Sequence, residues 1–274
     1  MKVCPIASGS SGNCIYVGEG NEGILIDAGI SRKRMVEGLK SIGVMPEEIR
    51  GICITHEHSD HIAGLKVFAK QYHTPLYATV GTFAFLQDKM GEVLSQCTCH
   101  IVEAGKAFSI DRMRVQALAI SHDAAEPVAY TVQIGECKFG MATDLGFYDE
   151  GTLDFLQGSQ ILLLEANHDI SMLQAGTYPY QLKRRILGNK GHLSNTAAGD
   201  LLCALLHDTL QHVYLAHLSK ENNYPELAYE TVRCQLRLHA GLEQYPFSMA
   251  VAKRNEPSCI VNSKNFDRAI SKVV

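Results

Sequence analysis

Residues 56–61 bring together four side chains of the kinds that bind metal ions. The run His-Glu-His-Ser-Asp-His has the pattern H-x-H-x-D-H, and its candidate ligands are His56, His58, Asp60 and His61. Neutral imidazole and carboxylate groups suit Zn, Mn, Fe or Ni. The spacing therefore predicts a site for transition-metal ions, and a histidine-rich surface turn is the alternative.

The predicted local structure explains how these side chains can bind two ions. Residues 52–54, Ile-Cys-Ile, are apolar and β-prone, which predicts a buried strand that ends just before His56. In extended backbone, positions i and i+2 face the same side, so His56 and His58 can bind one ion. Asp60 and His61 stand at the start of a predicted helix over residues 61–68 and can reach a second ion.

Three residues at predicted strand ends complete the ligand set. A pair of metal ions in a hydrolase needs a group that bridges them, and a carboxylate suits that role. Asp144 follows the predicted strand that ends at residues 140–143, and His122 and His217 stand at the ends of two others. The predicted arrangement places His56, His58 and His122 on one ion, Asp60, His61 and His217 on the other, and Asp144 between them.

The charge of this site bears on its substrate. Two divalent cations outweigh the carboxylates of Asp60 and Asp144, so the site is positive before any hydroxide binds. This favours a phosphate anion even within a chain whose formal net charge is −4. Asp27, in Leu-Ile-Asp-Ala-Gly, is predicted to accept a hydrogen bond from a ligand histidine and to fix its tautomer.

Composition limits the class of protein. The chain has 274 residues, of which 46% are hydrophobic, and this predicts one domain over residues 1–274. A pI near 6.3 argues against a broadly basic nucleic-acid binder. The nine cysteines show no C-x-x-C spacing, which favours a reducing cytoplasm. We see no signal pattern and no apolar run near the roughly 20 residues of a membrane span, so we expect a cytoplasmic protein without membrane insertion.

Short strands and helices alternate along the chain, which predicts an α/β (α+β) fold of sheets covered by helices. Ser31 is a candidate N-cap for a helix that runs to Gly43, and Ser194 for a helix with apolar positions from 198 to 206. Further helices are predicted over residues 61–68, 80–90 and 225–238. The predicted strands cover residues 3–7, 14–17, 23–28, 52–54, 74–78, 114–120, 128–134, 137–142, 160–165, 213–216 and 247–251.

The motifs resemble those of the metallo-β-lactamase fold, and they fall in order from residue 27 to residue 217. Within that superfamily the chain resembles the bacterial YycJ (WalJ/VicX) group over essentially its whole length. The segments that carry the resemblance are residues 8–13 (SGSSGN), 56–61, 165–169 (EANHD), 191–195 (GHLSN) and 217–219 (HLS). The resemblance implies an αββα four-layer sandwich with metals at one sheet edge, and the activity of a metal-dependent 5′→3′ exonuclease on DNA.

A Glu–His pair favours phosphodiester chemistry. Glu165 ends a predicted core strand, and His192 stands just before the helix that Ser194 caps. The pair resembles that of ribonuclease Z and the β-CASP nucleases, where the histidine protonates the leaving oxygen and the acid orients it. The β-CASP enzymes insert a cap domain between these two positions, whereas the segment between Glu165 and His192 is too short for a domain.

Other residues are candidates for contacts with the substrate. The basic cluster Lys183, Arg184 and Arg185 can hold phosphates, with a solvated helix face as the alternative. Lys220 and Asn222 follow His217 closely and can contact phosphate as well. The loop of residues 8–13 can offer backbone N–H groups to an anion, or can simply form a tight turn.

The sequence therefore predicts a phosphodiesterase or nuclease in which a metal-bridging hydroxide attacks phosphorus. The predicted catalytic residues are Asp60, Glu165 and His192, with His192 as the general acid. The predicted cofactors are two divalent transition-metal ions, Zn or Mn, with Fe or Ni as alternatives, and the predicted partner is DNA rather than RNA. The alternatives are a thioester, lactone or other ester hydrolase of the same fold, and a regulatory accessory protein in cell-envelope signalling. The oligomeric state does not follow from the sequence.

Overall fold

The computed structural model describes residues 1–263. The chain forms two compact units. Unit 1 comprises residues 1–119 and 124–137 together with the chain from residue 253, and unit 2 comprises residues 120–123 and 138–252. The metal-ligand run of residues 56–61 lies in unit 1, and the Glu165–His192 pair lies in unit 2.

Unit 1 is built on a seven-stranded sheet in the order β14-β1-β2-β3-β4-β5-β6. The strands from β14 to β3 pair antiparallel, and those from β3 to β6 pair parallel. Because the carboxyl ends of parallel strands meet at one edge, residues that follow β3 and β4 are brought together. The strands are β1 (Lys2–Ala7), β2 (Cys14–Glu19), β3 (Glu22–Ile26), β4 (Ile49–Cys53), β5 (Leu76–Ala78), β6 (Cys99–Ile101) and β14 (Val261–Asn262).

Helices of unit 1 pack apolar side chains into the core of this sheet, among them Leu39, Phe68 and Leu86. Ser31 caps the first of these helices, since its hydroxyl accepts a hydrogen bond from the Arg34 N–H. The helices are α1 (Arg32–Ser41), the 3₁₀ helix η1 (Pro46–Glu48), α2 (Ser59–Ile62), α3 (Leu65–Tyr72) and α4 (Val80–Leu94).

The single helix that we predicted over residues 61–68 is two helices, α2 and α3, and that prediction was wrong. The break falls at Gly64, whose N–H donates to the Ala28 carbonyl oxygen instead of continuing α2. A Cβ at Gly64 would stand 1.9 Å from the Ile30 carbonyl oxygen, so the close approach of the two backbones requires glycine. The break ends α2 directly after the metal-ligand run.

Unit 1 also contains an antiparallel meander of β7 (Ala107–Ile110), β8 (Met113–Ala119) and β9 (Val128–Ile134). The prediction for β9 was right to the residue. β9 is almost wholly buried along its length, and its sequence signal is a run rich in β-branched and aromatic residues between Pro127 and Gly135.

Unit 2 is a parallel sheet in the order β13-β12-β11-β10. Its central strands are buried on both faces and are rich in branched apolar residues, as the four consecutive residues 161–164 illustrate. The strands are β10 (Cys137–Ala142), β11 (Ile161–Glu165), β12 (His212–Ala216) and β13 (Ser248–Val251).

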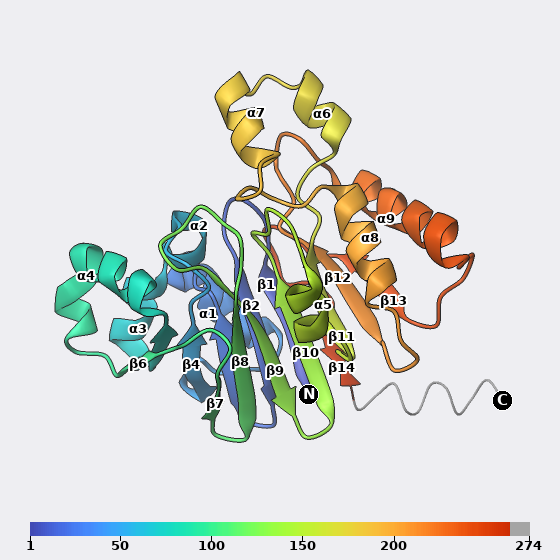
Figure 1. Cartoon of the computed structure of the whole chain (residues 1–274). Coiled ribbons are helices and arrows are strands. Elements are labelled where there is room, and N and C mark those ends of the chain that lie inside the picture. Colours follow the sequence, from blue (N-terminus) through green and yellow to red (C-terminus); the bar gives the residue numbers. More distant parts are fainter. Residues whose placement is uncertain (264–274) are drawn as a thin grey trace. The chain divides into compact units, whose positions relative to one another are not determined.

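The helices of unit 2 include a tightly packed pair, α8 and α9 (Figure 1). Gly199 allows this approach, because a Cβ there would stand 2.6 Å from the Cβ of Gln235. Ser194 caps α8 as predicted, with its hydroxyl accepting from the Ala197 N–H. The helices are α5 (Glu150–Leu156), α6 (Ile170–Ala175), α7 (Tyr180–Ile186), α8 (Asn195–Ala204) and α9 (Pro225–Ala240).

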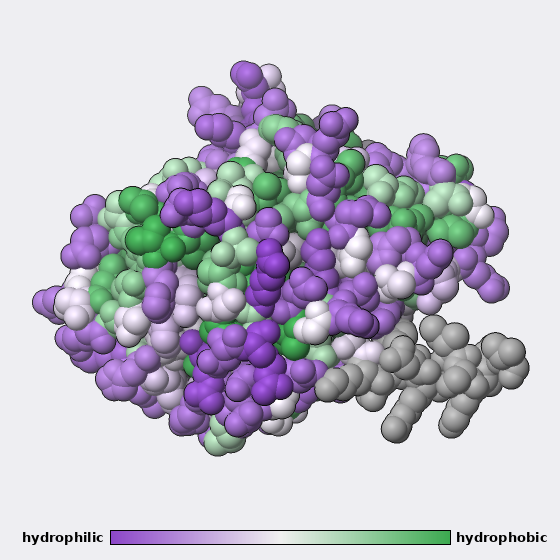
Figure 2. All heavy atoms as spheres, turned by 60° about the horizontal axis from the view of Figure 1, so that its bottom comes forward, coloured by the Kyte–Doolittle hydropathy of each residue, from purple (hydrophilic) through white to green (hydrophobic). Residues whose placement is uncertain are grey.

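One face of the molecule is predominantly polar. On the face that Figure 2 shows, apolar atoms lie in small groups among hydrophilic side chains. Within residues 1–263, none of the helices combines the length and the apolarity that crossing a bilayer requires.

Candidate metal centre

In unit 1, the residues after β4 bring three imidazoles together. His56 Nε2 lies 3.0 Å from His58 Nδ1, and the ring centroids of His56 and His61 are 4.1 Å apart. His56 follows the end of β4, His58 is the N-cap of α2, and His61 lies within α2. Two ring nitrogens that converge in this way can either share a proton or bind one cation.

The carboxylate of Asp60 lies beside His61. Its Oδ2 atom is 3.4 Å from His61 Nε2. The side-chain amide of Asn13 adjoins both groups, with Nδ2 at 3.4 Å from Asp60 Oδ2 and 3.2 Å from His61 Nε2. The Asn13 N–H also donates to the Asp60 carbonyl oxygen at 2.8 Å, so the loop of residues 8–13 is fastened to the ligand run.

A buried carboxylate, Asp27, forms hydrogen bonds with this cluster and fixes its orientation. Asp27 Oδ2 lies 2.7 Å from His61 Nδ1, and Oδ1 accepts from the Thr55 N–H at 2.8 Å. The Thr55 hydroxyl also contacts Asp27, and it lies 3.0 Å from His56 Nδ1. Because a carboxylate can only accept, His61 must carry its proton on Nδ1, which leaves the Nε2 lone pair to bind a metal.

In unit 2, the carboxylate of Glu165 is the centre of the arrangement. It is fully buried at the end of β11 and accepts four hydrogen bonds. Its Oε2 accepts from the N–H groups of Leu145 and Leu193 at 2.9 Å and 3.0 Å. Its Oε1 accepts from Nδ1 of His192 and of His217, each at 2.8 Å.

Burial alone would raise the pKa of Glu165. His192 and His217 outweigh that effect by their charge and their hydrogen bonds, so the pKa of Glu165 is held well below its usual range. Burial likewise lowers the pKa of His192, but Glu165 and then Asp144 outweigh it and raise that pKa above its ordinary value. The geometry therefore favours a charged Glu165 and a protonated His192.

Asp144 and His122 lie close to the Glu165 cluster. Asp144 Oδ1 is 3.5 Å from Nδ1 of both His192 and His217, and 3.7 Å from His122 Nε2. His122 Nδ1 lies 3.2 Å from the Gly191 carbonyl oxygen, which accepts its proton. Burial lowers the pKa of His122 and favours the neutral imidazole that binds metals.

These side chains fit divalent transition-metal ions. In His61, His122 and His217 the Nδ1 proton is held by an oxygen acceptor, so Nε2 is the nitrogen left with a lone pair. Metal-binding histidines are held in this way by a second hydrogen bond. In unit 2 the ligand atoms of four residues lie within 4.8 Å of one another: Asp144, Glu165, His192 and His217.

The residues that we predicted as substrate contacts differ in their surroundings. Lys183 Nζ donates to the Gln174 carbonyl oxygen at 2.7 Å, which ties α7 to α6. Arg185 forms an ion pair with Asp123, the residue after His122. Arg184 lies over the ring of Tyr180, 5.9 Å from its centroid. Lys220 is exposed, whereas Asn222 is buried.

Several residues in these clusters had no role in our sequence analysis. Thr55 joins Asp27 to His56, and Asn13 adjoins Asp60 and His61. Asn167 donates from Nδ2 to the His217 carbonyl oxygen at 2.9 Å, and Asn223 donates to the Asn167 carbonyl oxygen at 3.0 Å. Thr55, Asn167 and Asn223 lie near proposed site residues in the sequence, which is a weak signal because a polar residue next to a motif is common in any turn. Asn13 lies far from the ligands in the sequence and has no such signal.

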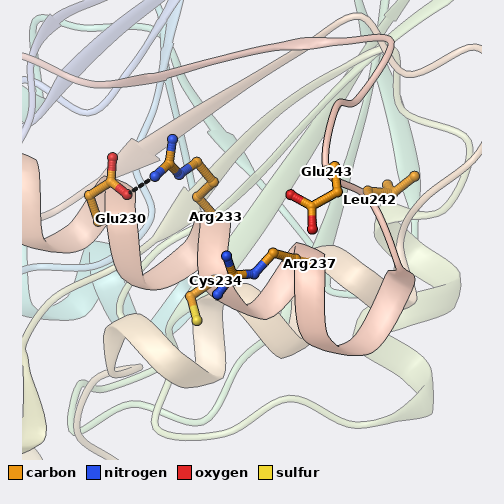
Figure 3. A pocket seen from close by; sticks show the side chains of 6 residues that line it. All are labelled: Glu230, Arg233, Cys234, Arg237, Leu242 and Glu243. Atoms are coloured by element: carbon orange, nitrogen blue, oxygen red, sulfur yellow. Dashed lines mark ion pairs between the residues drawn. The ribbon is translucent and has the colours of Figure 1, made fainter.

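A separate pocket of about 310 Å³ lies along α9 (Figure 3). Arg233 is paired there with Glu230 at 2.6 Å, and groups of both charges line the pocket. No residue that we predicted as a metal ligand lines this pocket. Its lining residues are Glu230, Arg233, Cys234, Arg237, Leu242 and Glu243.

Comparisons with known proteins identify the class. Residues 7–178 match the Metallo-beta-lactamase superfamily, and the chain belongs to that superfamily. The structure resembles that of Zn(2+)-bound PqqB from Methylobacterium extorquens with a TM-score of 0.72, at 16% identity over 94% of this chain and 100% of the other. The predicted αββα fold class is thereby confirmed.

Two curated relatives place the chain more narrowly. Exodeoxyribonuclease YycJ of Bacillus anthracis is 37% identical over 81% of this chain and 84% of its own length. Exodeoxyribonuclease WalJ of Streptococcus pneumoniae is 38% identical over 86% of this chain and 88% of its own length. The chain is a member of this YycJ/WalJ group, as the motifs predicted.

We expect Asp27→Asn to weaken metal binding while the fold persists. An amide nitrogen facing His61 Nδ1 would favour the tautomer with its proton on Nε2, which cannot then bind an ion. Loss of such a supporting group costs about 10- to 100-fold in metal affinity. Competition with a chromophoric chelator measures that affinity, and the thermal midpoint reports the fold.

Asp111→Asn is the matched control for this variant. Like Asp27, whose φ is 63°, Asp111 has a left-handed backbone, with φ of 49°. Asp111 lies in a surface turn, however, and pairs with Arg50. Metal affinity should be unchanged in Asp111→Asn. An Asp27→Asn protein that binds metal as tightly as the native one would show that the hydrogen bond does not set the tautomer.

Proposed function

We propose that this chain is a metal-dependent exonuclease that hydrolyses phosphodiester bonds of DNA from the 5′ end. The observation that carries the proposal is the 2.8 Å hydrogen bond between His192 Nδ1 and Glu165. Expulsion of an alkoxide from a phosphodiester benefits from a general acid, whereas a thioester releases a less basic thiolate that leaves without one. The names of the YycJ and WalJ relatives, both exodeoxyribonucleases, support the same reaction.

The metal ligands that we propose are the seven that the sequence predicts. Two divalent ions, Zn or Mn, would be held by His56, His58, Asp60, His61, His122, Asp144 and His217. When bound, such ions lower the pKa of a water molecule and stabilise negative charge on a phosphoryl group. The superfamily match and the orientation of the imidazoles support this assignment.

The residues of the chain then have distinct roles in the reaction. Glu165 keeps the Nδ1 proton of His192 directed at itself, so the Nε2 proton of a charged His192 is directed away from the buried carboxylate. That proton would pass to the leaving oxygen as the bond to phosphorus breaks. The same carboxylate oxygen fixes His217, so acid and ligand are positioned by one group.

Other features of the proposal concern the whole chain. We propose that residues 1–274 work as one functional domain, since the superfamily match over residues 7–178 includes parts of both units. A cytoplasmic location fits the nine cysteines, all of which are free thiols. Exposed cations near α7 would provide the local positive charge that a DNA strand needs on an acidic protein.

We expect Asp144→Asn to lower the metal content or the nuclease activity strongly. A neutral amide bridges two cations poorly, and it removes one negative charge from between them. Metal content is measured by elemental analysis of the purified protein, alongside nucleotide release from 5′-phosphorylated DNA with Mn. A chelator-treated, metal-free sample with full activity would refute the mechanism.

We expect His192→Ala to slow the cleavage of ordinary DNA by about 10²- to 10⁴-fold, the usual size of acid–base catalysis. Cleavage of a p-nitrophenyl phosphodiester should be nearly normal, because p-nitrophenolate leaves without a proton. Turnover of both substrates is followed under identical metal conditions. Equal losses on the two would assign His192 to binding or folding.

We expect Arg184→Ala to weaken DNA binding and to reduce the salt dependence of log Kd by about one unit of slope, the effect of one lost phosphate contact. Arg237→Ala removes the same charge from the α9 pocket and is the control. Arg185→Ala should in addition disturb His122 through Asp123, so its metal content should fall. If the salt dependence of log Kd were unchanged in Arg184→Ala, Arg184 would not contact a phosphate of the bound DNA.

A further inference from the structure

Unit 1 holds a second group of polar side chains beside the metal-ligand run. The loop of residues 8–13 joins β1 to β2, and Ser10 and Ser11 are exposed at its tip. Arg254, far away in the sequence, reaches this tip. Its Nη1 atom lies 3.4 Å from the Ser10 hydroxyl and 3.5 Å from the Ser11 hydroxyl.

The geometry points to a phosphate-binding subsite formed by Ser10, Ser11 and Arg254, whose ligand is a phosphate of the DNA strand. This inference rests on the proposed nuclease function, because it names a contact for that substrate. A guanidinium offers several N–H donors in a planar fork that matches phosphate oxygens. Each serine oxygen accepts a hydrogen bond from Arg254, so each hydroxyl group can donate its proton to a phosphate oxygen.

Side chains carry this subsite, because four of the six backbone N–H groups that we considered from the sequence already have partners. The loop's own N–H groups are largely used within the fold. Ser8 N–H donates to the Lys253 carbonyl oxygen, Gly12 N–H to Gly9, and Asn13 N–H to Asp60. The Gly9 N–H donates to the Asn13 side chain. These bonds hold the loop in one conformation, in which the hydroxyl groups of Ser10 and Ser11 are exposed at its tip.

The Arg254 backbone is fixed as well. Arg34 Nη2 donates to the Arg254 carbonyl oxygen at 3.2 Å, and the Lys253 N–H donates to the Ser258 hydroxyl at 2.9 Å. The nearby carboxylate of Glu256 is paired with Lys253 at 2.8 Å. Burial lowers the pKa of Arg254, which marks a partly desolvated cation, and such a cation attracts an anion more strongly than a solvated one.

The subsite is joined to the metal ligands by a short path. Asn13 adjoins Asp60 and His61, and Ser11 is two residues away, a span of at most about 7 Å. A phosphate held at Ser11 can therefore belong to the same strand as a bond that is cleaved at Asp60 and His61. The loop would position the strand, and the ligands would act on it.

The test measures binding of a phosphorothioate-linked, single-stranded oligonucleotide that resists cleavage, by fluorescence anisotropy. Arg254→Ala should weaken binding about 10-fold or more, the effect of a lost hydrogen bond to a charged group. Arg254→Lys should restore part of the affinity, since it keeps the charge and loses the fork. Replacing Ser10 and Ser11 together by Ala should weaken binding a few-fold.

Lys253→Ala is the matched control, because it removes a neighbouring cation that is already paired with Glu256. Its affinity should equal that of the native protein. Oligonucleotides with a 5′-phosphate and a 5′-hydroxyl are compared in each variant. A loss confined to the phosphorylated strand assigns the subsite to the terminal phosphate, and an equal loss on both assigns it to an internal one.

Native affinity in Arg254→Ala would overturn the inference. A second contradicting result would be a lower thermal midpoint together with a loss of turnover on a small p-nitrophenyl phosphodiester as large as the loss on DNA. The latter result would make Arg254 a structural tie between the loop and the chain after β13. Failure of the proposed function is distinguishable. In that case no DNA would be cleaved with any metal, whereas binding could still depend on Arg254.

Discussion

The site depends on one constraint, which is that a buried carboxylate must be satisfied by donors that the fold brings to it. Glu165 obtains four donors, two from backbone and two from imidazoles, and each fixes a different stretch of chain. An ionised carboxylate without such donors would be too costly to bury. Unit 1 has a second buried carboxylate of this kind, Asp27, which accepts hydrogen bonds from Thr55 and His61. In both units, the groups that stabilise the buried charge are those whose protons must be placed for metal chemistry.

Backbone strain occurs at three residues of the proposed site. Asp27, Asp144 and His217 have φ of 63°, 61° and 56°, in the left-handed region that costs a non-glycine residue about 1 kcal/mol or more. Each follows a core strand, where the chain must turn sharply while its side chain stays at the carboxyl edge of the sheet. Glycine would relieve the strain but would remove the carboxylate or the imidazole. The neighbouring hydrogen bonds offset the cost, as when Asn167 holds the His217 carbonyl oxygen.

The sequence carried the parts of this structure that depend on local signals. Strands β9 and β10 were predicted to the residue because short, mainly apolar segments bounded by turn residues specify them. The caps of α1 and α8 were equally local. The break at Gly64 was not, since it follows from the approach of the Ile30 carbonyl oxygen. Helix α7 buries none of its residues and so has no apolar periodicity to find. The roles of Asn13 and Arg254 depend on contacts between distant segments, which spacing along a sequence cannot reveal.

The absence of room for a cap domain between Glu165 and His192 changes how a polymer can be held. In place of a domain, that segment forms two short helices, α6 and α7, which the Lys183 contact to Gln174 joins. One of its cations, Arg185, is used to fix Asp123, and Arg184 lies over an exposed aromatic ring. The proposed nuclease would therefore hold a strand mainly near the reacting bond, because a net charge of −4 gives the protein as a whole no attraction for a polyanion.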